Sequence, residues 1–177
     1  MIIAVGGSAA SGKTTLAKAL AERLGLKHIS AGEIMREMAA EQGVSLLEFS
    51  KAAEGDYSID RVIDERQKTQ AAKGDCVVDG RLSAFMIPQS DLKVFLTAPF
   101  EVRAKRIFER EKDTLKSIIE AKTAVLEREA SEAKRYAGIY DIDLNDLSVY
   151  DLIVNTEKWG IKETQELIEK AVTLLGP

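Results

Sequence analysis

Residues 7–14 read GSAASGKT, which matches the pattern G-x-x-x-x-G-K-[ST] and strongly limits the folds open to this chain. The apolar run Ile2–Val5 precedes the motif, and a helical pattern from Thr14 to Leu24 follows it and stops at Gly25. A buried strand, a glycine-rich loop and a helix N-terminus in this order direct backbone N–H groups and the positive end of the helix dipole toward one point. The sequence therefore predicts a loop that wraps around a chain of phosphates.

Two side chains of this loop can act on a bound nucleotide. Lys13 is placed to reach the β- and γ-phosphates, and the hydroxyl of Thr14 can bind a Mg²⁺ ion that accompanies them. A later apolar run ends in Asp79, Gly80 and Arg81. An acid at the tip of a buried strand beside the phosphate loop is suited to hold Mg²⁺, directly or through water. We therefore expect Thr14 and Asp79 on the metal side, with Arg81 pointing into the cleft.

Short apolar runs alternate with longer helical patterns along the chain. The candidate strands are Ile2–Val5, His28–Ser30, Cys76–Asp79, Leu92–Leu96 and Leu152–Asn155. Three of them contain unbroken apolar runs, which is typical of strands covered by helices on both faces. This alternation predicts an α/β fold: a five-stranded parallel sheet with helices on both faces and a ligand site at the carboxyl ends of the strands.

We expect a single domain over residues 1–177, because no linker, repeat or low-complexity tract interrupts the chain. Two stretches without strands have helical patterns, one at about residues 31–73 and one at about residues 100–140. In a phosphotransferase, such insertions close over two substrates and exclude water, which otherwise competes as the phosphoryl acceptor. The remaining segments form the expected core: residues 1–30, 74–99 and 141–177.

Composition excludes several classes of protein. The net charge of −4 argues against a general nucleic-acid binder, and no apolar run is long enough to span a membrane. The N-terminus lacks the basic region of a signal peptide, so we expect a cytoplasmic protein. The one cysteine, Cys76, is expected to be a buried thiol, and the lone His28 an ordinary residue beside a strand. Any metal ion is expected to arrive with the nucleotide.

Arginines gather in the second insertion. Arg103, Arg106 and Arg110 fall within about 60° of arc on one helix, and Arg128 and Arg135, seven residues apart, within about 20°. Arginine suits phosphoryl transfer because it stays ionised and binds phosphate oxygens through two N–H groups. Acidic residues, among them Glu101, Glu109 and Glu132, interleave with the arginines, and many of these charges are expected to form a solvated face.

The first insertion opens with a possible helix cap. Ser30 stands at the expected N-cap with Glu33 three residues later, which is the capping-box pattern. Arg36, one to two turns into the same helix, has the position of a clamp on an acceptor phosphate. Spacing alone favours neither interpretation over the other.

Together these segments resemble the nucleoside monophosphate kinase family, and more closely its archaeal cytidylate kinases. Residues 30–36, SAGEIMR, are similar to the family pattern S-x-G-[DE]-x-x-R, and residues 79–83 match the archaeal segment DGRLS. Residues 127–136, EREASEAKRY, resemble the lid segment, and residues 150–156 with Trp159 resemble the closing strand and adenine loop. The resemblance covers nearly the whole chain. It implies the P-loop NTPase fold, with a helical monophosphate-binding insertion and a helical lid.

The resemblance also implies a role for individual residues. ATP and Mg²⁺ would be held by the loop and by Arg110, the loop residues being Gly7, Ser8, Ala9, Ala10, Ser11, Gly12, Lys13, Thr14 and Thr15. The acceptor, CMP or dCMP, would be bound by Ser30, Arg36, Asp79, Gly80 and Arg81. Transfer would be promoted by Lys13, Arg106, Arg128 and Arg135. The protein is expected to act as a monomer.

Some alternatives stay open from sequence. Leu82 stands where the bacterial enzymes have an acid, so the contacts to cytosine are not assigned, and Ser83, Phe49, Tyr57 and Phe85 are candidates only. A kinase for another nucleoside monophosphate or a small metabolite would share the same loop and lid. A non-catalytic ATP-binding module is a weaker alternative, because it would not use the arginines of a second anion site.

Overall fold

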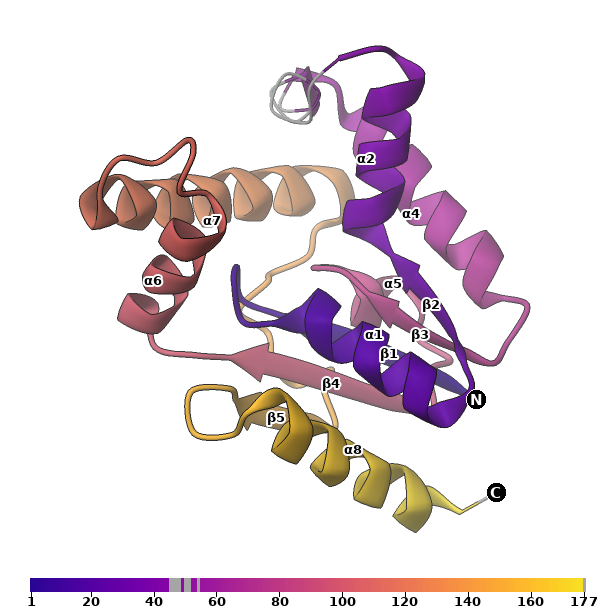
Figure 1. The fold of residues 1–177 in the computed structure, drawn as a ribbon. Coiled ribbons are helices and arrows are strands. Elements are labelled where there is room, and N and C mark those ends of the chain that lie inside the picture. Colours follow the sequence, from indigo (N-terminus) through magenta and orange to yellow (C-terminus); the bar gives the residue numbers. More distant parts are fainter. Residues whose placement is uncertain (45–48, 50–51, 54, 177) are drawn as a thin grey trace.

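The computed structural model describes residues 1–44, 49, 52–53 and 55–176 (Figure 1). A parallel sheet lies at its centre, and helices extend beyond one edge of the sheet. The strands are β1 (Ile2–Gly7), β2 (Lys27–Ser30), β3 (Cys76–Asp79), β4 (Leu92–Thr97) and β5 (Leu152–Asn155). The helices are α1 (Lys13–Leu24), α2 (Ala31–Glu41), α4 (Tyr57–Ala71), α5 (Ser83–Met86), α6 (Phe100–Arg110), α7 (Ile118–Tyr140) and α8 (Ile161–Leu175).

The sheet confirms the expected α/β fold. Its five strands are all parallel and lie in the order β2-β3-β1-β4-β5. The central strand β1 pairs with β3 through Val5 and Asp79, and with β4 through Gly7 and Leu96. The carboxyl end of β1 therefore lies between the carboxyl ends of β3 and β4. This register brings the phosphate loop next to Asp79.

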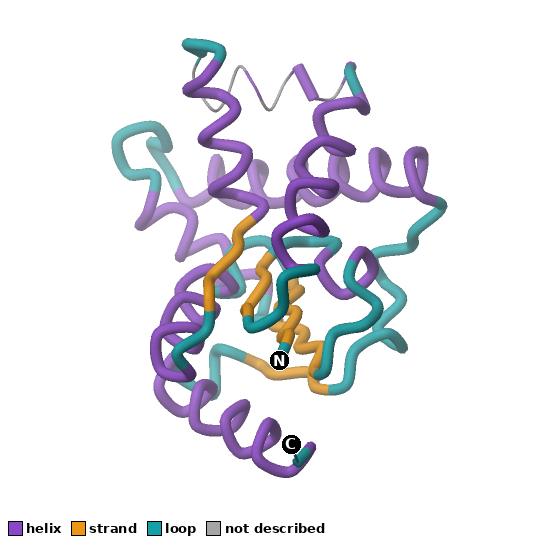
Figure 2. Tube along the Cα trace, turned by 90° about the vertical axis from the view of Figure 1, so that its right-hand side faces the viewer, coloured by secondary structure: helices purple, strands orange, loops and turns teal. Residues whose placement is uncertain are grey.

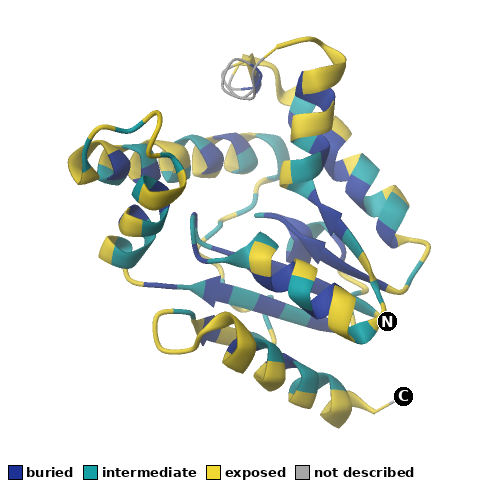
Figure 3. Cartoon of the chain, viewed as in Figure 1, coloured by how far each residue is buried: buried dark blue, intermediate teal, exposed yellow. Residues whose placement is uncertain are grey.

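Helices cover both faces of the sheet, as the unbroken apolar runs predict. Ile3 and Val5 of β1 pack in one cluster with Leu20 of α1 and Ile168 of α8. On the opposite face, Val78 of β3 packs in a second cluster with residues of α2 and α4. The central strands β1 and β3 are accordingly buried along almost their whole length (Figure 3). Burying one such aliphatic side chain stabilises the fold by about 1.5–3 kcal/mol, so this core fixes the positions of the strand ends.

Two helical regions project beyond the carboxyl edge of the sheet (Figures 1 and 2). The first contains α2 and α4, which pack on β2 and β3 through residues such as Ile34 and Ile63. The second contains α6 and α7, which pack together through Ala104, Ile107 and Val125 against Ala9 of the phosphate loop. Helix α7 crosses above this edge and reaches toward α2 and α4. Among the described residues, no helix combines the length and apolar character needed to span a bilayer.

Candidate functional site

The phosphate loop between β1 and α1 has the backbone geometry that its glycines permit. Gly7 has a φ of 144° and Gly12, the N-cap of α1, a φ of 96°. A Cβ at Gly7 would collide with the carbonyl of Leu96, and the N–H of Ser8 donates to that same carbonyl at 3.1 Å. Ala10 also has a left-handed φ of 57°, which costs roughly 1–2 kcal/mol. The hydrogen bond from Ser8 thus fixes the loop against the end of β4, and the backbone at Ala10 is strained.

Lys13 folds back over this loop. Its Nζ donates to the carbonyls of Gly7 at 2.9 Å and Ser8 at 2.8 Å. Burial, assisted by the nearby positive charge of Arg81, lowers the pKa of Lys13 to about 7. The Lys13 side chain is therefore held where a phosphate in the loop would contact it. The negative charge of that phosphate would raise the pKa of Lys13 again and favour the charged ammonium.

Thr14 and Asp79 meet as the sequence predicts. The Thr14 hydroxyl donates to Oδ2 of Asp79 at 2.8 Å. The other carboxylate oxygen of Asp79 lies 2.6 Å from Nε2 of His28, and the Asp79 carbonyl accepts from Gln67 at 3.0 Å. His28 is therefore not an ordinary strand-side residue, because it fixes one oxygen of the acid expected beside the metal. Its place on β2, one strand beyond Asp79, explains the contact.

Two acidic residues of α7 turn into the site and contact its cations. Glu129 accepts from the backbone N–H of Ala9 at 3.1 Å and from Arg103 at 2.6 Å. Glu132 pairs with Arg81, whose Nη1 also donates to the carbonyl of Gly7 at 2.8 Å. The Arg81 guanidinium thus connects the phosphate loop to α7. A nucleotide phosphate bound at the Ala9 N–H would take the place of the Glu129 carboxylate.

Glu132 corrects the expectation that the acids of this region form a solvated face. Its side chain is only 8% exposed, and it bonds to Arg128 at 2.9 Å as well as to Arg81. These cations hold the pKa of Glu132 below its ordinary value although burial opposes them. By contrast, Glu101 and Glu109 are exposed, as expected. Helical spacing pairs Glu132 with Arg128, but the contact with Arg81 depends on how α7 crosses the sheet.

The arginines of α6 differ in their contacts and exposure. Arg103 and Arg106 donate to the carbonyls of Ala9 and Ala10, each at 3.3 Å. Arg106 also donates to the carbonyl of Thr156 at 2.8 Å and so joins the phosphate loop to the loop after β5. Arg110 is exposed and pairs with Glu111. The expected shared face is therefore real for Arg103 and Arg106, while Arg110 lies at its outer end.

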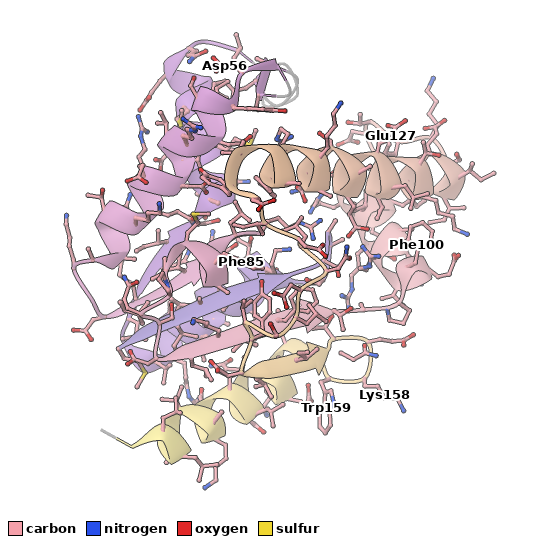
Figure 4. All side chains as sticks on the ribbon, turned by 180° about the vertical axis from the view of Figure 1, so that it is seen from behind. Asp56, Phe85, Phe100, Glu127, Lys158 and Trp159 are labelled. Atoms are coloured by element: carbon pink, nitrogen blue, oxygen red, sulfur yellow. The ribbon has the colours of Figure 1, made fainter. Side chains whose placement is uncertain are left out.

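A cavity of about 350 Å³ adjoins the phosphate loop on the side of β5. Its wall includes Gly12, Thr15, Arg106 and Arg110, and Trp159 stands at its rim with half of its surface exposed. Figure 4 shows Trp159 and its neighbour on the loop between β5 and α8. The size and the aromatic rim suit a purine base whose phosphates lie in the loop.

The start of α2, where the acceptor is expected, has donors without a partner among the described residues, and it has no capping box. Ser30 is the N-cap of α2, yet its side chain makes no cap bond, and Glu33 instead pairs with Lys18 at 2.6 Å. The Ser30 hydroxyl is buried without a hydrogen-bond partner among the described residues. Arg36 is exposed, and no ion pair involves it within the described part of the chain. Close packing on Ala31 explains Gly80, because a Cβ there would lie 3.1 Å from the Ala31 side chain.

None of the four candidates for base contact is distinguished by the structure. Phe49 is a buried core residue, and Tyr57 is exposed. The Ser83 hydroxyl is already bonded to the carbonyl of Val5 at 3.2 Å. Phe85 packs edge-on against Tyr150.

The two arginines of α7 point to different partners. Arg128 is exposed and bonds to Glu132. Arg135 is buried and bonds to Asp60 of α4 at 2.9 Å. Sequence reasoning missed Asp60, His28, Glu129 and Thr156. Glu129 alone had a local signal, because it lies beside the lid arginines, whereas the other contacts span 50 residues or more.

A model of the cytidylate kinase-like family matches residues 2–158. The chain belongs to this family. The cytidylate kinase of Pyrococcus horikoshii is 47% identical over 177 residues, which cover 100% of this chain and 91% of that relative. The cytidylate kinase of Haloarcula marismortui is 49% identical, with 100% and 92% covered. That of Methanocaldococcus jannaschii is 46% identical, with 97% of both chains covered. The family expected from sequence is confirmed.

Solved structures confirm the fold class as well. A shikimate kinase from Bacteroides thetaiotaomicron has a TM-score of 0.67 at 17% identity, with 98% of each chain covered. An uncharacterized protein from Eubacterium ventriosum has a TM-score of 0.72 at 20% identity, with the same coverage. At these identities the likeness concerns the fold, which is that of the P-loop kinases.

Proposed function

We propose that this protein transfers the γ-phosphoryl group of ATP to CMP or dCMP and releases ADP with CDP or dCDP. The position of Arg81 supports a two-substrate transferase most directly. This arginine follows the strand beside the phosphate loop, and it contacts both Gly7 of that loop and Glu132 of α7. The nearby charges of Arg81 and of Arg128 on α7 also act on Lys13 of the loop, so cations from three parts of the chain lie near one another. The choice of cytidine is supported by the activity for which the archaeal relatives are named.

The reaction needs positioning and charge neutralisation rather than a general base. An oxygen of the acceptor phosphate attacks the γ-phosphorus, the bond from that phosphorus to the β–γ bridging oxygen breaks, and its electron pair leaves on ADP. The acceptor phosphate is already an anion, so no proton has to be removed first. Lys13, Arg106, Arg128 and Arg135 are the proposed catalytic residues, because they can neutralise charge on the transferring group.

The residues around the loop fit ATP with Mg²⁺. The hydroxyl of Thr14 and the carboxylate of Asp79, 2.8 Å apart, are the oxygen ligands that Mg²⁺ prefers. No cluster of three or more His, Cys, Asp or Glu side chains able to hold a metal occurs in the described part of the chain. The ion would therefore share its site with the phosphates of ATP, whose charge it neutralises when bound. We propose that the loop, residues 7–15, holds those phosphates and that the adenine occupies the cavity beside Arg106 and Arg110.

The acceptor phosphate is proposed to lie between α2 and the end of β3. Ser30 and Arg36 offer donors there that have no partner among the described residues. Arg81 borders the same space from the end of β3, with Asp79 and Gly80 just before it. We also propose that the enzyme acts as a monomer.

A panel of acceptors tests the proposal. ADP release from ATP and Mg²⁺ is measured with CMP, dCMP, UMP, AMP and dTMP in parallel. We expect CMP and dCMP to give the highest kcat/KM. Preference for another monophosphate would replace the cytosine assignment and leave the kinase mechanism in place. Transfer to none of the five would refute the acceptor site and favour a protein that only binds ATP.

A further inference from the structure

Two buried carboxylates of α4 contact side chains in the C-terminal half of α7. Asp60 bonds to Arg135, and Asp64 accepts from the hydroxyl of Tyr140 at 2.7 Å. Figures 1 and 2 show α7 crossing from α6 to the region of α2 and α4, so these bonds join the two helical insertions. The sequence separations of 75 and 76 residues make them long-range contacts.

Asp60 holds one edge of the Arg135 guanidinium. Nε donates to Oδ2 of Asp60 at 2.9 Å, and Nη2 lies 3.4 Å from Oδ1. Nη1 donates to the Ser131 hydroxyl at 3.1 Å, and the ring of Tyr136 lies 5.5 Å from the guanidinium carbon. A guanidinium has five N–H groups, so the bonds within the described part of the chain leave one N–H on each Nη for a further acceptor. The group is therefore fixed in place and still able to bind an anion.

Arg135 also lies close to the cation cluster of the candidate site. Glu132 is one helical turn before it on α7 and contacts Arg81, which in turn contacts Gly7 of the phosphate loop. A phosphate held by the loop and Arg81 would thus lie near Glu132, whose charge also acts on the guanidinium that Asp60 fixes.

We propose that Asp60 is a positioning residue, which holds Arg135 in the orientation needed for phosphoryl transfer and so makes the acceptor-binding insertion and the lid act together. The proposal rests on the phosphotransferase function proposed above. Asp60 itself touches neither substrate in this scheme. Its effect passes through Arg135.

A purely structural role explains the pair less well. The side chains are 6% and 9% exposed, so both charges lose most of their hydration. Pairing a buried carboxylate with a guanidinium commonly adds little net stability compared with apolar residues of similar size. In agreement, burial raises the pKa of Asp60 although Arg135 opposes the change. A buried ion pair that joins the two helical insertions is better explained by the orientation that it gives to the arginine.

The test compares Asp60→Asn with Asp64→Asn as the matched control. Both substitutions remove a buried carboxylate that bonds to α7, but only the first touches Arg135. We expect Asp60→Asn to lower kcat for CMP phosphorylation about 10–100-fold, with the KM for ATP changed less than about threefold. Asp60→Glu should recover part of the loss, and Asp64→Asn should stay near the wild-type kcat. Rates are measured well below the Tm of each variant.

A double-mutant cycle decides between positioning and general stabilisation. If Asp60 acts through Arg135, then Asp60→Asn should have almost no further effect on kcat in an Arg135→Ala background. An equal loss in both backgrounds, or an equal loss in Asp64→Asn, would overturn the proposal. If Asp60→Asn does not fold, Asp60→Glu takes its place in the same cycle and the same criterion applies.

Failure of the proposed function has a different signature. A wild-type protein that phosphorylates no monophosphate would overturn the function and, with it, the role of Asp60. Wild-type transfer with an unchanged kcat in Asp60→Asn would overturn the role of Asp60 alone.

Discussion

At the scale of single residues, Lys13 is the side chain on which the proposed transfer depends most. Its ammonium lies over the phosphate loop, bonded only to the carbonyls of Gly7 and Ser8 among the contacts described. We expect Lys13→Ala to lower kcat by about 10²–10³-fold or more, because a donor to the developing negative charge is removed. Steady-state rates with CMP give this value, and circular dichroism checks that the fold survives. Activity above a tenth of wild type in a folded variant would contradict the mechanism.

Arg36 provides a separate prediction for the acceptor. Its guanidinium is exposed on α2, and a charge-assisted bond to phosphate contributes about 1.5–3 kcal/mol. We expect Arg36→Ala to raise the KM for CMP roughly 10–100-fold while the KM for ATP changes little. Arg61→Ala, which removes an exposed arginine from α4, is the control and should leave both values unchanged. If Arg36→Ala raises only the KM for ATP, the donor and acceptor sides have been assigned the wrong way round.

Residue-scale prediction from sequence succeeded where neighbours along the chain carry the information. The phosphate loop and the pairing of Thr14 with Asp79 follow from a motif and from the end of a buried strand. His28 was misjudged because its partner, Asp79, is 51 residues away. The burial of Glu132 was not expected for a similar reason. Helical spacing shows that Glu132 lies near Arg128, but it does not show the contact with Arg81.

At the scale of elements, the contact between α4 and α7 should make stability depend on pH. Burial raises the pKa of Asp64 to about 6, and the bond from Tyr140 only partly opposes this rise. The other charged groups that act on Asp64 are Asp60, Lys68 and Glu65. In the unfolded chain an aspartate titrates near 3.9. Between about pH 4 and about pH 6 the folded state therefore binds more protons than the unfolded state, and the contribution of Asp64 to stability falls as the pH rises.

Asp64→Asn should abolish this decline. The free energy of unfolding of the variant, minus that of the wild type, is expected to grow by roughly 2 kcal/mol between about pH 4 and about pH 7. Urea titrations at several pH values measure the difference. A difference that stays constant over this range would mean that Asp64 titrates normally in the folded protein.

Elements were predicted more completely than the contacts between them. All five strands occur where candidate strands were expected, and β3 and β5 have the expected bounds. β4 extends one residue further, to Thr97, whose carbonyl accepts from Thr156 and so lengthens the pairing with β5. The capping box expected at Ser30 fails because Glu33 bonds to Lys18 of α1, which local sequence does not reveal.

At the scale of the whole molecule, the site is assembled from parts that lie far apart in sequence. The loop after β1, the end of β3, α6 and α7 each contribute a cation, and α4 holds the last of these cations through Asp60. The fold class could be predicted because the order of strands and helices determines the topology. The crossing of α7 over the sheet could not, because it depends on packing between insertions that have no shared motif.

This division of the site predicts how the enzyme treats ATP in the absence of an acceptor. The proposed transfer requires cations from both insertions around the transferring group, and we expect an acceptor phosphate to draw Arg36 of α2 toward Arg81, which already contacts the loop. We expect ATP hydrolysis without CMP to run at less than about a hundredth of the rate of transfer to CMP, because closure that excludes water is incomplete. Phosphate and ADP release, measured with and without CMP, give the two rates. Cytidine is the matched control: it supplies the base and sugar without the phosphate, so it should not drive closure. Hydrolysis that equals transfer, or that cytidine stimulates strongly, would show that the acceptor phosphate is not what brings the insertions together.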